Sequence, residues 1–433
     1  MSTTSIGFFG VALMLFLLFT GVEIGFSFIG AGMVGIGLML GFKGSLSVLK
    51  TIPLSQSLSY TLAVLPMFML LGDFAVTGDL TSDAYGAARK WLGHRTAGLA
   101  ITSTVSSAVF GAISGSASAT AMVMTRVAWP EMKKYGYEPS LGLSSIAAAG
   151  PLAILIPPST PMIVFGILSN TSVGKLFMGG WIPGIILTVM MCSITVVLVK
   201  IHPERAPKTE KAPMKERFRS LSKPLPIFIL IIVIMYCIWG GVTTVNEAAG
   251  VAVICCLIIV IAKRRAGIKK LWKALVEGSS RAAGLFFMFI GIQVFNSFLS
   301  MSKLPTLLTN FIISLPFSPY TVIWCIVGLY FILGMFIDAA VMMMLTVPLI
   351  YPVVVALGFD LVWYGIISAL CSALALITPP VGGCLFVIGS QTPDIPLSLI
   401  MRGVWPYVIA IFATIALVIY IPQLALFLPS KMI

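Results

Sequence analysis

The sequence predicts an all-α protein that crosses a membrane many times. Of its 433 residues, 59% are hydrophobic and only 9% are charged, whereas charged residues make up about 25% of ordinary soluble domains. The mean hydropathy is +1.07. Because about 20 apolar residues cross the hydrocarbon core as one helix, the chain has room for roughly a dozen spans. This composition excludes a water-soluble enzyme.

Apolar segments follow one another along the whole chain. Two of them, 97–130 and 319–355, are too long for one span, and each is interrupted near its middle, at 111–118 and at 334–338. We therefore expect each to form a re-entrant helical hairpin. The segments lie at about 6–20, 24–41, 56–78, 97–130, 140–169, 178–200, 224–241, 247–262, 282–301, 319–355, 361–390 and 402–428.

Paired prolines interrupt two further segments. Pro157-Pro158 lies within 156–161, and Pro379-Pro380 lies within 377–383. Consecutive prolines remove amide donors and clash with the preceding turn, so each helix must break there. Irregular backbone at membrane depth persists only where protein buries it or where it lines a polar cavity.

These interruptions recur at a nearly constant offset, which indicates a duplicated unit. Five pairs of landmarks are separated by 222 to 224 residues: Gly111 and Gly334, Pro130 and Pro352, Pro157 and Pro379, Gly166 and Gly389, and Trp181 and Trp405.

The net charge of +13 reflects membrane orientation rather than nucleic-acid binding, because the basic residues lie between apolar segments. Two basic stretches, 200–223 and 263–281, are separated by two spans and so share one side, which the positive-inside rule makes cytoplasmic. Propagating this topology puts both termini outside and makes the two halves inverted relative to each other.

A short amphipathic segment precedes each expected hairpin. Leu80, Ala84, Ala87 and Trp91 share one helical face in the first half, and Leu304, Leu308, Phe311 and Leu315 do so in the second. Their spacing and flanking charges predict helices along the membrane interface, with a plain loop helix as the alternative.

Interrupted segments at corresponding positions of inverted repeats point to a transporter binding site at the midplane. Broken helix ends expose amides that suit anions and carbonyls that suit Na⁺. The sequence therefore predicts an organic anion carried with coupling cations. It contains neither the HExxH motif nor a complete phosphate-binding loop, so we predict a transporter and not an enzyme.

The candidate binding residues lie at the interruptions. Small and hydroxyl residues at Ser114, Gly115 and Ser116 allow close approach of a ligand. Asp338 is an ionisable residue in an apolar stretch, suited either to coordinating Na⁺ or to anchoring the hairpin. Arg126 could pair with a substrate carboxylate, could extend its charge to the interface or could bond to a neighbouring carbonyl.

Other acidic residues receive structural interpretations. Glu247 follows 243–246 at the start of a span, which predicts an acidic first turn of a helix. Glu23 and Asp73 are placed near turns and are given no role.

Four motifs together resemble the large membrane subunit of tripartite ATP-independent periplasmic (TRAP) transporters. They are 110–117 (FGAISGSA), 157–162 (PPSTPM), 243–249 (TTVNEAA) and 377–383 (ITPPVGG), and the resemblance covers essentially the whole chain. It implies an elevator-type Na⁺ symporter for small organic anions in the bacterial inner membrane. It also implies two partners, a small four-helix membrane subunit and a periplasmic substrate-binding protein.

The resemblance also implies roles for individual residues. Ser114, Ser116 and Ser159 would face substrate or ion at the first hairpin, while Asp338, Thr378 and Gly382 would belong to the second ion site. Gly115, Pro157 and Gly334 complete the predicted ion-binding set. The chain departs from many dicarboxylate members at two positions, with Thr120 where they carry an acidic residue and Arg126 where they carry a small one, which leaves a sulfonate or a second carboxylate open.

We expect two transport segments within a scaffold. The transport domain would comprise 96–177 and 319–400, and scaffold spans, linkers and arm helices would comprise 1–95, 178–318 and 401–433. Two alternatives stay open: a stand-alone divalent-anion/Na⁺ symporter that needs no binding protein, and an intramembrane enzyme or purely structural subunit.

Overall fold

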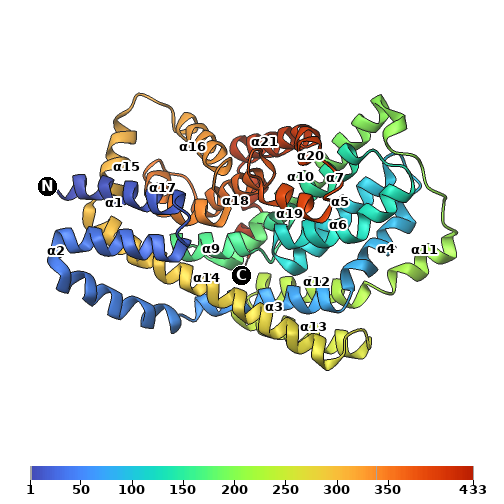
Figure 1. Ribbon diagram of the computed structural model, residues 1–433, viewed down its shortest axis with the longest axis horizontal. Coiled ribbons are helices and arrows are strands. Elements are labelled where there is room, and N and C mark those ends of the chain that lie inside the picture. Colours follow the sequence, from blue (N-terminus) through green and yellow to red (C-terminus); the bar gives the residue numbers. More distant parts are fainter. Residues whose placement is uncertain (1, 338, 433) are drawn as a thin grey trace.

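The computed structural model describes residues 2–337 and 339–432, which form helices joined by short turns (Figure 1). Three 3₁₀ turns lie at Thr61–Ala63, Pro203–Arg205 and Pro429–Lys431. The α-helices are α1 (Thr3–Phe19), α2 (Ile24–Ser57), α3 (Val64–Thr77), α4 (Leu80–Leu92), α5 (Gly98–Ser114), α6 (Ala117–Lys134), α7 (Pro139–Ala149), α8 (Leu152–Leu155), α9 (Thr160–Ser169), α10 (Val173–Ile201), α11 (Met214–Leu221), α12 (Leu225–Trp239), α13 (Val245–Ala262), α14 (Ile268–Ser302), α15 (Leu304–Ser314), α16 (Pro319–Gly334), α17 (Ala339–Ala356), α18 (Leu361–Ile377), α19 (Gly383–Gln391), α20 (Leu397–Gly403), α21 (Trp405–Tyr420) and α22 (Gln423–Leu426).

Length and composition make the protein a multi-pass membrane protein. Within the described residues, six helices are long and apolar enough to span a bilayer, and the number rises to nine if each of three bent pairs counts as one span. The fold class predicted from composition is therefore confirmed.

The predicted helix interruptions are present. In the first hairpin, α5 ends at Ser114 and α6 begins at Ala117, and the two arms pack on each other. In the second, α16 ends at Gly334 and α17 begins at Ala339. Asp338, which the sequence singles out in this turn, lies outside the described residues.

Both proline pairs interrupt helices as predicted. The segment α7–α8 is bent by 41° relative to α9 across the first pair, and α18 and α19 are separated by 378–382 at the second. Both prolyl bonds, Pro157-Pro158 and Pro379-Pro380, are cis.

The broken elements of the two halves pack against one another in a reciprocal pattern. The second arm of the first hairpin, α6, packs on α19, and the second arm of the second hairpin, α17, packs on α9. Helix α8 also contacts α18. Figure 1 shows α9, α18 and α19 near the middle of the molecule, between the two hairpins. The interrupted elements of one half therefore pack against those of the other half.

Equivalent glycines hold each hairpin against its neighbouring broken helix. A Cβ added at Gly111 would lie 2.6 Å from the Ala153 Cα, and one added at Gly334 would lie 2.5 Å from the Ala375 Cβ. Both alanines precede a proline pair by four residues. The recurring offset in the sequence thus corresponds to a recurring packing contact.

Outer helices α2, α3, α13 and α14 form a second packed group, along which α14 runs as a long diagonal in Figure 1. The second apolar segment, expected to end at Gly41, does break there, and a second helical part of α2 follows the break up to Ser57. Gly41 has φ +76°, a conformation that glycine adopts without strain, so the chain changes direction there and the helix resumes.

The basic stretch 263–281 is also more ordered than the sequence indicated. Helix α14 begins at Ile268, so its charged residues from Lys269 to Arg281 lie on a helix rather than in a linker. The predicted helices at 80–91 and 304–315 are confirmed as α4 and α15.

Glu247 has the structural role that the sequence predicts. The Thr244 backbone amide donates to Glu247 Oε2 at 2.8 Å, while the Glu247 amide donates to Thr244 Oγ1 at 3.3 Å. This reciprocal capping box starts α13.

We expect Gly334→Val to destabilise the second hairpin, whereas Gly328→Val on the same helix serves as the control. The side chain added at Gly334 meets Ala375, while Gly328 has open space around it. Overpacking of this kind costs about 2 kcal/mol. Thermal unfolding in detergent, followed by tryptophan fluorescence, should show a lower midpoint for the first variant only; equal midpoints for the two variants would contradict the packing argument.

Candidate functional site

The turn of the first hairpin and the first proline break form one unit, here called the first junction (114–116 and 156–160). The Thr160 amide donates to the Gly115 carbonyl at 3.4 Å. Gly115 has φ +57°, and a Cβ there would lie 3.0 Å from the Pro158 carbonyl oxygen. Glycine is therefore required both for the turn and for the close approach of the two backbones.

Hydroxyl groups order this turn. Ser114 Oγ and Thr120 Oγ1 are hydrogen-bonded at 2.9 Å, and Thr120 Oγ1 also donates to the Ser116 carbonyl at 2.8 Å. Ser116 Oγ accepts the Ala119 amide at 3.4 Å and so caps α6. Thr120, which the sequence marked only as a departure from relatives, thus stabilises the turn.

The second junction (334–337 and 378–382) repeats this arrangement. The Val381 amide donates to the Met335 carbonyl at 3.3 Å, as Thr160 does to Gly115. Gly382 has φ +47° and starts α19. The buried Thr378 hydroxyl donates to the Leu374 carbonyl at 2.6 Å. Gly334, Thr378 and Gly382 are therefore gathered around one turn.

Beside the first junction lies a cavity of about 650 Å³. Ser114, Ser116 and Ser118 line one wall, and outer helices α3 and α14 line the other. At Gly72 on α3 a Cβ would lie 2.9 Å from the Ser114 Cα, so the hairpin turn rests directly on this helix. The cavity is thus bounded by the two packed groups of helices.

The predicted site residues divide into three places. Ser114 and Ser116 line the cavity. Ser159 and Pro157 are buried, and Ser159 Oγ donates to the Ile154 carbonyl at 2.5 Å. Arg126 does not line this cavity; its Nε donates to Gln391 Oε1 on α19 at 3.1 Å. Of the three alternatives given for Arg126, this bond is most similar to the one with a neighbouring carbonyl, except that the oxygen belongs to a side-chain amide.

An ion pair that the sequence missed faces the hairpin turn. Arg281 of α14 pairs with Asp73 of α3, and both line the cavity. Gly278 leaves room for the carboxylate, because a Cβ there would lie 2.5 Å from Asp73 Oδ2. Asp73, which the sequence placed near a turn and gave no role, lies in the last part of α3, four residues before that helix ends.

A sequence signal for this wall did exist. Lys270, Lys273, Glu277 and Arg281 follow one another at helical spacing and all line the cavity. Because 263–281 was interpreted as a basic stretch between spans, the helical spacing of these four residues was not used. Asp73 offered a second signal, because it is a charged residue between apolar neighbours.

Comparison with known proteins decides the family. The model of the tripartite ATP-independent periplasmic transporter, DctM component, matches residues 11–424. The chain belongs to this family. It is 30% identical over 402 residues to the C4-dicarboxylate TRAP transporter large permease protein DctM of Pseudomonas aeruginosa, covering 90% of this chain and 93% of that protein. It is 29% identical to the sialic acid TRAP transporter large permease protein SiaM of Vibrio cholerae, covering 96% of each chain.

The fold is shared with a more distant transporter. The crystal structure of the Alcanivorax borkumensis YdaH transporter matches with a TM-score of 0.62 at 14% sequence identity, covering 87% of this chain and 88% of that one. This likeness concerns the fold alone. Together the comparisons identify a TRAP transporter membrane subunit and not an enzyme.

We expect the Asp73–Arg281 pair to be energetically coupled. Asp73→Asn and Arg281→Gln each leave one charge without its partner, so each should lower the unfolding temperature, and the double variant should recover part of the loss. The Arg281 side chain is 52% exposed, which limits the coupling to about 1 kcal/mol.

The matched control is Lys273→Gln. Its pair with Glu277 joins exposed side chains at 3.7 Å on one helix, so the variant should melt like the parent protein. Strictly additive effects in the thermal-melting cycle of Asp73 and Arg281 would show that the pair is not coupled.

Proposed function

We propose that this chain carries out Na⁺-coupled uptake of a small organic anion, a carboxylate or a sulfonate. The observation that supports this most is the pair of equivalent junctions, each joining a hairpin turn to a broken helix through a backbone hydrogen bond. Two interrupted elements at related positions are typical of ion and substrate sites in secondary transporters. Membership of an ATP-independent family is consistent with ion coupling.

The proposed ion sites are the two junctions. Ser114, Gly115 and Pro157 would supply oxygen atoms at the first, while Gly334, Thr378 and Gly382, with Asp338, would do so at the second. Across residues 2–337 and 339–432, no group of three or more His, Cys, Asp or Glu side chains could hold a metal ion. Carbonyl and hydroxyl oxygens are the groups that the junctions offer, and Na⁺ accepts such ligands at broken helices.

The proposed anion site lies at the cavity wall formed by Ser114 and Ser116, with Ser159 behind them. The first turn of α6 lines this cavity, and the amides at a helix N-terminus favour negative charge. Arg281 presents a guanidinium to the same space, where it could receive a carboxylate or sulfonate. Arg126 would act from α6 only after leaving Gln391.

The proposed movement is that of an elevator between inverted repeats. Residues 96–177 and 319–400 would move as the transport domain against a scaffold of 1–95, 178–318 and 401–433. The contact between Gly72 and Ser114 would be the surface on which the first hairpin slides. Binding of Na⁺ and the anion together would reduce the net charge that has to cross the bilayer.

The proposed assembly contains two further proteins in the bacterial inner membrane and periplasm. A small four-helix membrane subunit would pack on the scaffold, and a periplasmic binding protein would deliver the anion. The relatives named above, described as large permease proteins for C4-dicarboxylates and for sialic acid, support a division of labour of this kind.

Replacing Na⁺ with choline should strongly reduce transport. The assay is counterflow in proteoliposomes that contain this chain and its small subunit, using the anion that raises the melting temperature of the accompanying binding protein. Because the junctions would be left without their coupling ion, we expect the rate to fall at least about tenfold. Counterflow that continues unchanged in choline would refute the coupling.

Ser114→Ala should lower the same counterflow about tenfold, since the hydroxyl both lines the cavity and orders the turn. Ser193→Ala on α10 is the matched control: its exposed hydroxyl bonds only within its own helix, to the Val189 carbonyl at 2.8 Å. Full activity of the Ser114 variant would favour a purely structural subunit.

Uptake that needs no added binding protein would favour the stand-alone symporter.

A further inference from the structure

The basic stretch 200–223, which the sequence assigned only to membrane orientation, contains a short helix with three distinct faces. Arg217 and Ser220 of α11 are buried against the protein, with Arg217 only 7% exposed. Met214, Phe218 and Leu221 form an exposed apolar stripe at helical spacing. At 100° per residue, Lys215 and Arg219 lie next to this stripe, on the side of the helix opposite the buried Arg217 and Ser220.

The apolar stripe continues onto the next helix. Helix α12 begins at Leu225, after the turn residues 222–224 and a bend of 50°. Leu225, Ile229 and Ile232 are exposed on α12. Because α12 is an apolar segment that enters the membrane, the stripe on α11 lies where that segment meets the membrane surface.

Contacts to α4 fix how α11 is rotated. Trp91 Nε1 donates to the Arg217 carbonyl at 3.1 Å, and the Trp91 ring meets the Phe218 ring edge-on with centroids 5.4 Å apart. Lys90 pairs with Glu216 at 3.0 Å. These contacts join α11 to α4 and touch one edge of the stripe at Phe218, which stays 61% exposed, as do Met214 at 55% and Leu221 at 42%.

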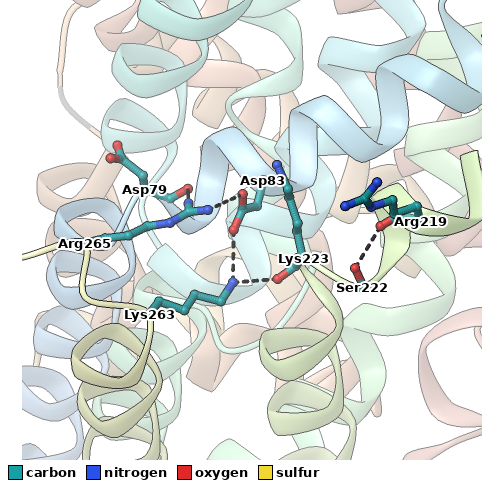
Figure 2. Close-up of polar contacts among 7 residues, drawn as sticks. All are labelled: Asp79, Asp83, Arg219, Ser222, Lys223, Lys263 and Arg265. Carbon is teal, nitrogen blue, oxygen red and sulfur yellow. Dashed lines mark hydrogen bonds and ion pairs between the residues drawn. The ribbon is translucent and has the colours of Figure 1, made fainter. Parts of the chain in front are cut away.

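A buried ion cluster holds the start of α12 against the same helix. Figure 2 shows Lys263 and Arg265 converging on Asp83 of α4, each at 3.0 Å. Lys263 Nζ also donates to the Lys223 carbonyl at 2.6 Å, and Ser222 Oγ bonds to the Arg219 carbonyl at 2.8 Å. The Asp83 side chain is only 5% exposed, while those of Lys263 and Arg265 are 21% and 30% exposed, so a buried carboxylate of α4 joins both basic residues.

We propose that α11 is a binding surface for anionic phospholipid headgroups. Its apolar stripe would enter the headgroup boundary, and the exposed basic residues would bind lipid phosphate. These basic residues are Lys208, Lys211, Lys215, Arg219 and Lys223. A cluster of four to eight Lys or Arg beside a membrane span is typical of anionic lipid binding, and an amphipathic helix rich in basic residues is typical of interfacial insertion.

Charge and continuity favour lipid over a protein occupant. The stripe is continuous with apolar residues on a membrane segment, so the same medium covers both. Within the described part of the chain, the single acidic residue on α11, Glu216, already pairs with Lys90. The uncovered face therefore offers positive charge next to apolar side chains, which matches a phospholipid surface.

Bound lipid would restrain more than α11. Helix α4 precedes α5 with only five residues between them, and α4 packs on both α5 and α11. Anionic lipid would therefore hold the base from which the first hairpin extends, whatever substrate the protein carries.

Hydrogen exchange measured by mass spectrometry tests the proposal without any substrate. The full chain is placed in nanodiscs of phosphatidylcholine alone or of phosphatidylcholine with phosphatidylglycerol at 3:1. We expect peptides from 208–223 to exchange about fivefold more slowly when phosphatidylglycerol is present, with 0.5 M NaCl reducing the difference. Peptides from α4 should follow the same trend.

Lys215→Gln combined with Arg219→Gln should remove the phosphatidylglycerol effect while leaving exchange in phosphatidylcholine unchanged. The control combines Lys133→Gln with Lys134→Gln, which removes the same charge from exposed positions at the end of α6 and should keep the effect. Equal exchange in both lipids, or loss of the effect in the control, would overturn the proposal. Protection that requires the small subunit and ignores lipid charge would assign the face to that protein instead.

Discussion

Pairing of backbone groups at the helix breaks is the constraint on which the rest of this structure depends. In a bilayer an unpaired amide or carbonyl costs several kcal/mol, yet each half of the chain interrupts two membrane segments. The two junctions meet this requirement in the same way, with an amide after the proline pair bonding to a carbonyl in the hairpin turn.

Close approach of backbones follows from that pairing and explains where small residues are indispensable. Gly111 and Gly334 seat the hairpins on Ala153 and Ala375, and Gly115 lets the first turn meet Pro158. Gly72 brings the outer helix α3 onto the same turn. Small residues therefore lie at each close contact between the outer helices, the hairpin and the broken helix.

Charged residues are arranged around this apolar bundle in two distinct ways. Asp73 and Arg281 pair with each other and face the cavity next to the hairpin turn. Asp83, Lys263 and Arg265 instead form a buried cluster that ties α4 to the start of α12. The basic linkers thus contribute attachment sites for α4 in addition to membrane orientation.

The sequence by itself determined the fold class, the four interruptions and the serine and glycine residues of the first turn, because apolar runs, paired prolines and repeated offsets are local features of a chain in lipid. It did not determine that a helical part follows the break at Gly41 or that α14 begins at Ile268, since charged residues mark the membrane boundary but do not end a helix. Only the tertiary structure brought Asp73 to Arg281, buried Ser159 and directed Arg126 to Gln391. Those pairings join residues up to 265 positions apart, and the packing of separate helices, rather than any local pattern, decides which of them meet.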